Sequence, residues 1–184
     1  MANVLVPLAD GCEEIETITI VDLLRRAEID VTTAALTGHE VTGSHDITIR
    51  ADKTLDDALQ DDYDMVVLPG GMPGADHLEN DQRLRELLRA MAESEKFTAA
   101  ICAAPKVLGA AGLLDGRRAT SFPGFLDSYP VEHSDDAVVR DGLVITSRGP
   151  GTAMDFALAL IEALAGKQRR DEVEGRLQRP HLAA

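Results

Sequence analysis

Residues 64–74 read Asp-Met-Val-Val-Leu-Pro-Gly-Gly-Met-Pro-Gly, and this stretch decides the class of fold. Its four consecutive apolar residues, 65–68, are too few for a buried helix and are typical of a strand that is covered on both faces. The prolines and glycines of residues 69–74 end the strand in a loop. A strand of this kind predicts a parallel sheet that lies between two layers of helices.

The same alternation of short strands and longer helices continues on both sides of this stretch. The expected strands are residues 3–8, 29–36, 64–68 and 97–101, with a hairpin at Asp141-Gly142 and a weaker hairpin or edge strand within 41–51. The expected helices are residues 15–27, 55–59, a segment capped by Asp81, 105–111 and 152–164. The pattern therefore predicts an α/β protein with a mostly parallel sheet covered on both faces.

Composition limits the classes of protein that the chain can belong to. Its 184 residues suit a single domain over 1–184, with a core of about 3–166 and a charged C-terminal helix or tail over 167–184 whose last residues fray. The formal net charge of −14 argues against nucleic acid as the main partner. No apolar run is long enough to cross a membrane, and the first residues lack the basic region of a signal peptide, so we expect a cytoplasmic protein. The acidic surface fits either a salt-rich cytoplasm or an ordinary acidic protein.

Three loops are expected to meet at one edge of the predicted sheet. The segment Asp10–Glu16 follows the first strand, Pro69–Gly74 follows a central strand, and Cys102 follows the strand at 97–101. In open parallel sheets, ligands bind beyond the carboxyl ends of the strands. We therefore expect a functional site where these three loops come together.

The sequence around Cys102 has the pattern of a nucleophile elbow. It reads Thr-Ala-Ala-Ile-Cys-Ala-Ala-Pro over residues 98–105, in which a strand runs into a cysteine with small neighbours and a proline suited to a first helical turn. A cysteine before a helix is expected to have a lowered thiol pKa and to act as a nucleophile. The alternative is a small buried core cysteine, which is the interpretation we favour for Cys12.

Two further groups of residues could complete such a site. Gly70 and Gly71 can turn their backbone N–H groups toward an oxyanion, although two glycines also form an ordinary tight turn. Glu13, Glu14 and Glu16 lie at the start of the first helix, where acids commonly complement the helix dipole. One of the three could instead carry a proton in the cleft, and their spacing does not choose between them.

At this point the residues resemble the ThiJ/PfpI superfamily, in the branch of the Parkinson-disease-associated protein deglycase and the YajL-like chaperones. The resemblance extends from about residue 4 to residue 166. Its anchors are Glu-Glu-Ile-Glu-Thr (13–17), Val-Asp-Leu-Leu-Arg-Arg (21–26), Val-Leu-Pro-Gly-Gly (67–71), Ala-Ala-Ile-Cys-Ala-Ala-Pro (99–105) and Thr-Ser-Arg-Gly-Pro-Gly-Thr (146–152).

The resemblance implies a flavodoxin-like three-layer sandwich, like that of class I glutamine amidotransferases, which usually forms a homodimer. It implies that Cys102 is the reactive and easily oxidised cysteine and that Glu16 shares a proton with its sulfur. The backbone N–H groups of Gly71 and Ala103 would then form the oxyanion pocket. No metal and no organic cofactor is implied, and Glu13 and Glu14 become surface or structural acids.

The chain departs from some relatives at three positions. Where members with a histidine in the cleft read Thr-His-Pro, this chain has Ser121-Phe122-Pro123, as YajL-like members do. Ala103 stands where peptidase members have a histidine, which argues against a Cys-His peptidase. His45 is expected to be a solvated loop residue rather than part of a dimer interface, and His133 a surface residue rather than a member of a triad.

Three functions follow from these expectations. The first is a cofactor-independent cysteine enzyme of the glyoxalase III or protein deglycase type, which converts methylglyoxal to lactate or acts on glycation adducts. In it, Cys102 forms a hemithioacetal and Glu16 transfers a proton. The second is a redox-sensing chaperone that responds to oxidative stress through oxidation of Cys102. The third is an amidotransferase-like or peptidase-like hydrolase, which would need His133 beside Cys102.

Overall fold

The computed structural model describes residues 1–179, and a seven-stranded sheet forms the centre of this part of the chain. In sheet order the strands are β10 (Val138–Asp141), β11 (Val144–Ser147), β7 (Phe97–Ile101), β6 (Met65–Leu68), β1 (Asn3–Leu8), β2 (Asp30–Ala35) and β5 (Lys53–Thr54). Every neighbouring pair is parallel except β10 and β11, which form an antiparallel hairpin. The predicted parallel sheet and the hairpin at Asp141-Gly142 are both confirmed.

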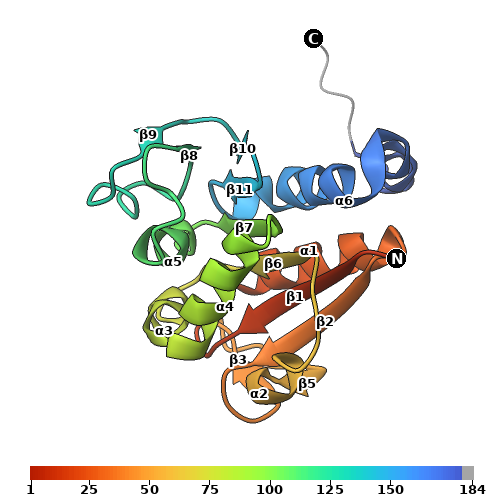
Figure 1. Cartoon of the computed structure of the whole chain (residues 1–184). Coiled ribbons are helices and arrows are strands. Elements are labelled where there is room, and N and C mark those ends of the chain that lie inside the picture. The colour runs from red at the N-terminus through yellow and green to blue at the C-terminus, as the bar shows by residue number, and fades with distance from the viewer. Residues whose placement is uncertain (180–184) are drawn as a thin grey trace.

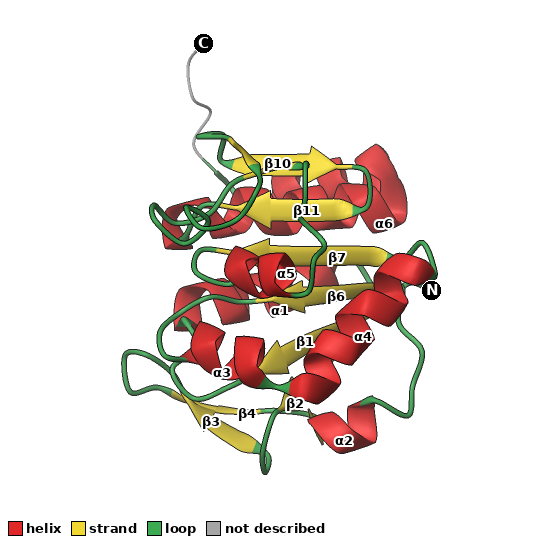
Figure 2. Cartoon of the chain, turned by 60° about the vertical axis from the view of Figure 1, so that its left-hand side comes forward, coloured by secondary structure: helices red, strands yellow, loops and turns green. Residues whose placement is uncertain are grey.

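Helices cover the sheet on its two faces (Figures 1 and 2). One face is covered by α1 (Glu14–Arg26) and α6 (Ala153–Arg176), and the other by α2 (Leu55–Ala58), α3 (Gly74–Asn80), α4 (Gln82–Glu93) and α5 (Pro105–Ala110). A short 3₁₀ turn, η1 (Pro150–Thr152), leads into α6. This is the three-layer α/β sandwich expected from the alternating pattern and from the resemblance.

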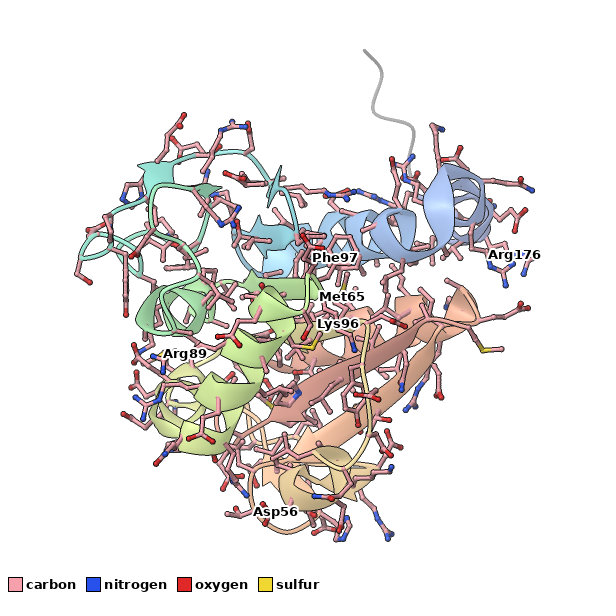
Figure 3. All side chains as sticks on the ribbon, viewed as in Figure 1. Asp56, Met65, Arg89, Lys96, Phe97 and Arg176 are labelled. Carbon is pink, nitrogen blue, oxygen red and sulfur yellow. The ribbon has the colours of Figure 1, made fainter. Side chains whose placement is uncertain are left out.

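The central strand β6 is buried on both faces, which explains why it is continuously apolar. In β6, Met65 and Val67 face the core below α1 and α6, whereas Val66 and Leu68 face the core below α2 to α5. Met65 pairs with Phe97 at the start of β7, and both are labelled in Figure 3. Burying an apolar side chain of this size stabilises the fold by about 1.5–3 kcal/mol, so β6 contributes to the cores on both faces of the sheet.

Two small strand pairs lie outside the main sheet. The antiparallel pair β3 (Glu40–Thr42) and β4 (Thr48–Arg50) confirms the predicted hairpin around Gly43. The parallel pair β8 (Arg118–Ala119) and β9 (Glu132–His133) was not predicted, and neither was β5. Strands of two residues are too short to show a period of apolar residues.

Two helical segments differ from the expectation. Helix α3 begins at Gly74, directly after the glycine-rich loop, and Asp81 ends it before capping α4 through a hydrogen bond from the Leu84 N–H to its side chain. The helix expected over 152–164 continues in α6 past Gly166, where φ is 85° and the helix kinks, so the segment expected as a helix or tail is helical up to Arg176. Val173 of this segment is buried in the core, and the predicted frayed end at 180–184 lies outside the described residues.

The lengths and the apolar content of the helices bear on the expectation that no segment crosses a membrane. Among the helices of residues 1–179, none is both long enough and apolar enough to span a bilayer.

Candidate active site

Cys102 occupies a strained turn at the carboxyl end of β7. Its φ is 64°, in the left-handed region that residues other than glycine rarely adopt. The turn is held from both sides, because the Cys102 N–H donates to the Ser147 carbonyl at 3.0 Å and the Cys102 carbonyl accepts from the Phe122 N–H at 2.8 Å. Strained backbone that the surrounding structure maintains is typical of functional positions. The predicted nucleophile elbow therefore has the expected geometry.

Glu16 lies at the first turn of α1 and is completely buried. Its Oε2 atom accepts a hydrogen bond of 2.8 Å from the Gly70 N–H. Its Oε1 atom is buried and has no hydrogen-bond partner of standard geometry within residues 1–179. The side chain that faces this carboxyl is Cys102, which also shifts its pKa. Of the three acids that the sequence offered, the structure brings Glu16 to the cysteine.

The two glycines after β6 allow this approach. A Cβ atom at Gly70 would lie 2.7 Å from the Cys102 Cβ and 2.9 Å from Glu16 Oε2, so any side chain would separate the acid from the cysteine. Gly71 has a φ of 91°, and a Cβ there would lie 2.4 Å from the Glu13 nitrogen. Both positions therefore require glycine, for close packing at the first and for backbone conformation as well at the second.

The pKa of the Cys102 thiol is higher than its position before a helix predicts. Burial and the negative charge of Glu16 raise the pKa of Cys102 to about 12, and the N–H groups of Gly71 and Ala103 lower it by less. The expectation of a lowered thiol pKa is therefore wrong while Glu16 is ionised. The physical reason is that burial of the thiol and the facing Glu16 carboxylate outweigh the N–H groups near the start of α5.

The carboxyl of the pair is shifted toward neutrality. Burial raises the pKa of Glu16 to about 7, against the opposing effect of the Gly70 N–H. Because Glu16 and Cys102 face each other, the first proton leaves the pair near neutral pH and the second is much harder to remove. Near pH 7 the pair thus changes between two protons and one, so Glu16 can both give and take a proton beside the sulfur, as a proton-transferring cysteine site needs.

The other two acids have structural roles. The Glu13 side chain caps α1 by accepting the Glu16 N–H at 2.8 Å. The Glu14 carboxylate accepts the N–H groups of His45 at 2.7 Å and Ile47 at 3.4 Å, and so holds the turn between β3 and β4. Glu13, Glu14 and His45 also place possible metal-binding atoms within 4.8 Å of one another, but hydrogen bonds to the turn already occupy the Glu14 oxygens.

The structure shows the burial and the contacts of the remaining candidates. The His45 side chain is largely exposed, with Nδ1 3.0 Å from Glu14 Oε2. His133 is exposed in β9, and within the described residues no hydrogen bond joins its ring to Cys102 or Glu16. Cys12 is buried, and burial raises the pKa of its thiol.

Sequence reasoning missed the role of two residues beside the sulfur. A Cβ atom at Gly149 would lie 4.0 Å from the Cys102 sulfur and 3.5 Å from Phe122 Cδ2. Both residues belong to quoted motifs, but only the fold shows that the loops before β9 and after β11 meet at Cys102. The replacement of a cleft histidine by Phe122 was the one available signal.

These features define a class. A doubly covered parallel sheet that presents a cysteine on a strained strand-to-helix turn, next to a buried acid, is the framework of α/β proteins with a cysteine nucleophile. Within that class the family is also clear. The chain belongs to the DJ-1/PfpI family, whose model matches residues 2–163.

Individual relatives support this assignment. The chain is 45% identical to protein dj-1beta of Drosophila melanogaster over 93% of this chain and 94% of that protein. It is 43% identical to protein DJ-1 homolog B of Arabidopsis thaliana over 91% of this chain, but spans only 39% of that longer protein. It is 35% identical to the glutathione-independent glyoxalase DJR-1.2 of Caenorhabditis elegans over 94% of this chain and 92% of that protein.

Solved structures agree with the fold. The crystal structure of Drosophila melanogaster DJ-1beta matches with a TM-score of 0.93 at 42% identity and covers 98% of this chain and 99% of that one. Oxidised Toxoplasma gondii DJ-1 matches with a TM-score of 0.93 at 37% identity, over 96% of this chain and 98% of that one. The flavodoxin-like sandwich and the suspected family are therefore confirmed.

Proposed function

We propose that this protein is a cofactor-independent glyoxalase that converts methylglyoxal and similar small 2-oxoaldehydes to 2-hydroxy acids. The observation that carries the proposal is the buried carboxyl of Glu16, which faces the Cys102 sulfur and has a pKa of about 7. The Caenorhabditis elegans relative, which is named a glutathione-independent glyoxalase, gives further support. The deglycase variant of this proposal uses the same chemistry on early glycation adducts.

The first step is addition of sulfur to the aldehyde. With the shared proton on Glu16, the Cys102 thiolate attacks the aldehyde carbon, and the carbonyl electron pair moves onto oxygen. The N–H groups of Gly71 and Ala103, which already stabilise negative charge on the sulfur, are the donors available to the new oxyanion. Glu16 then gives its proton to that oxygen, which leaves a neutral hemithioacetal and a Glu16 carboxylate.

The second step moves hydrogen between the two carbons of the substrate. The Glu16 carboxylate removes the C–H proton of the former aldehyde carbon, which leaves an enediolate with its negative charge on the neighbouring oxygen, and then returns this proton to the neighbouring carbon. The hydroxyl proton shifts to the neighbouring oxygen, so the product is a Cys102 thioester of the 2-hydroxy acid. Water then cleaves the thioester, releases lactate from methylglyoxal and restores the thiol–carboxyl pair. The sum is methylglyoxal plus water to lactate, with no external oxidant or reductant.

The direct test is incubation of the purified protein with methylglyoxal, with no added thiol or metal. We expect lactate to form in proportion to enzyme concentration, and the activity to survive dialysis against a chelator. Lactate no higher than in a protein-free blank would reject the proposal.

A second function is favoured by the same geometry. The N–H groups of Gly71 and Ala103 and the Glu16 carboxyl are placed to stabilise an oxidised sulfur as well, and the Toxoplasma gondii relative has been solved in an oxidised form. We propose a redox-sensing role through oxidation of Cys102, with the chaperone activity that the resemblance suggested as its output.

Peroxide titration followed by intact mass tests the redox proposal. We expect a single stable addition of two oxygens that maps to Cys102, because Glu16 can donate its proton to a sulfinate. Cys12 is buried and should stay reduced at the same peroxide dose. Scattered oxidation of Cys12 and methionines, with no preference for Cys102, would contradict it.

We also propose that the protein forms a homodimer through one apolar patch. Ile15 and Ile18 on α1 and Ile47 in the β3–β4 turn are each more than half exposed, and Glu14 binds that turn beside them. Exposed apolar residues that gather in this way mark interaction surfaces. Sedimentation should give about twice the chain mass of 19.7 kDa. Ile18→Glu should give the monomer, whereas Ala92→Glu on the opposite face should not.

The hydrolase alternative gains no support from the site. Ala103 follows the cysteine, and His133 makes no hydrogen bond to it within the described residues, so no histidine is in position to activate Cys102 as in a peptidase. The cytoplasmic location and the independence from metals and cofactors stay predictions.

A further inference from the structure

The backbone conformation at position 149 does not require glycine. Its φ of 168° and ψ of −168° are extended values that any residue adopts. A Cβ atom there would touch Phe122 Cδ2 at 3.5 Å and the Cys102 sulfur at 4.0 Å, which are ordinary contact distances. An alanine would therefore fit without strain or clash. What glycine provides at this position is a space about the size of one methyl group, bordered by the sulfur and the Phe122 ring.

The walls of this space are held in place by the same hydrogen bonds that hold the elbow. The Phe122 N–H donates to the Cys102 carbonyl at 2.8 Å, and the Phe122 ring packs edge-on against Phe125 with 6.2 Å between centroids. The Gly149 N–H donates to Thr152 Oγ1 at 3.2 Å, and that hydroxyl is bonded to Ser147 Oγ. The Ser147 carbonyl in turn accepts the Cys102 N–H. The space thus cannot widen without disturbing the turn at Cys102.

The other sides of the sulfur are already occupied. The N–H groups of Gly71 and Ala103 and the Glu16 carboxyl all act on it, and the sulfur's residue is only 9% exposed. Phe122, by contrast, is 47% exposed, so the wall that its side chain forms beside Gly149 also borders solvent. For a molecule bonded to the sulfur, with its oxyanion on the N–H groups, the space beside Gly149 and Phe122 is open to the rest of its carbon skeleton.

We propose that Gly149 and Phe122 form a substituent pocket that sets the size of the substrate. Resting on the proposed glyoxalase function, this assigns as substrates 2-oxoaldehydes whose second carbon carries hydrogen or methyl, and places branched or aromatic 2-oxoaldehydes outside the preferred class. Filling a pocket by one methylene-sized group typically changes discrimination by about 10–200-fold.

The test compares Gly149→Ala with Gly151→Ala, a control two residues away whose Cβ would meet nothing within 4 Å. We expect Gly149→Ala to lower kcat/KM for methylglyoxal relative to glyoxal by about tenfold or more. Phe122→Ala should raise the relative kcat/KM for phenylglyoxal, because it removes the opposite wall. Gly151→Ala should leave these ratios unchanged. Unchanged ratios in both Gly149→Ala and Phe122→Ala would overturn the proposal.

A second measurement does not need turnover. The rates at which iodoacetamide and the bulkier N-ethylmaleimide alkylate Cys102 can be followed by mass spectrometry, and their ratio cancels any change in thiol pKa. We expect Gly149→Ala to lower the maleimide rate relative to the iodoacetamide rate by about tenfold, with no change in Gly151→Ala. An unchanged ratio in Gly149→Ala rejects the pocket. If the wild type forms no lactate but this ratio falls, the glyoxalase proposal fails and the size-selective pocket stands.

Discussion

Replacing Cys102 with serine is expected to lower lactate formation from methylglyoxal by at least about 10³-fold, because a serine hydroxyl does not ionise at this site. The change is nearly isosteric, and serine can occupy the turn at φ 64° as well as cysteine does. The loss should appear in kcat and in kcat/KM, since the missing group forms the covalent intermediate. The measurement is steady-state lactate production at pH 7.

The other cysteine of the chain supplies the matched control. Cys12→Ala removes a buried thiol that does not contact the substrate in the proposed mechanism, so it should lower stability modestly and leave kcat close to that of the wild type. Equal losses in the two variants would mean that the effect is on folding. Full activity in Cys102→Ser would remove the nucleophile from the mechanism.

Replacing Glu16 with glutamine is expected to abolish turnover. It is also expected to make the protein increasingly more stable than the wild type as pH rises. Burial raises the folded-state pKa of Glu16 from 4.5 to about 7. A carboxyl with a raised pKa contributes stability that is fully present below pH 4.5 and is lost as pH rises through 7. Glutamine keeps an acceptor for the Gly70 N–H and carries no charge, so it avoids this loss.

The size of the effect follows from the shift. The quantity to compare is the unfolding free energy of Glu16→Gln minus that of the wild type. Between pH 4 and pH 8 this difference should rise by about 3 kcal/mol in favour of the variant. Urea unfolding at several pH values measures this difference. Glu93→Gln, a change of an exposed carboxyl on α4, is the control and should leave the difference flat. A flat difference for Glu16→Gln would show that Glu16 ionises in the fold without cost.

The main layers could be predicted because their signal is local. The strand around Val66 is continuously apolar, the strand around Ala99 is mostly so, and Asp141-Gly142 marks its hairpin by turn chemistry alone. Helix α3 could not be predicted in the same way. It starts at Gly74 directly after a run of proline and glycine, and no regular apolar period distinguishes its seven residues from a loop.

The site was predictable in part for a different reason. The elbow at Cys102 is a local pattern, whereas the choice among three acids depends on how α1 lies against the loop after β6. Glu13 caps α1, Glu14 holds the β3–β4 turn, and Glu16 is buried beside the sulfur. The thiol pKa could not be read from the sequence, because burial and a facing charge, both tertiary, outweigh a six-residue helix.

The two hydrogen bonds that fasten the backbone of Cys102 have a consequence for how the protein meets its reactants. One runs to Ser147 in the sheet and the other comes from Phe122 in a loop, so the cysteine cannot swing outward to reach a distant group. The Cys102 sulfur is therefore fixed in position. Reactants must diffuse to it, which favours small free metabolites. A glycated residue on another folded protein could reach the sulfur only from a long, flexible segment.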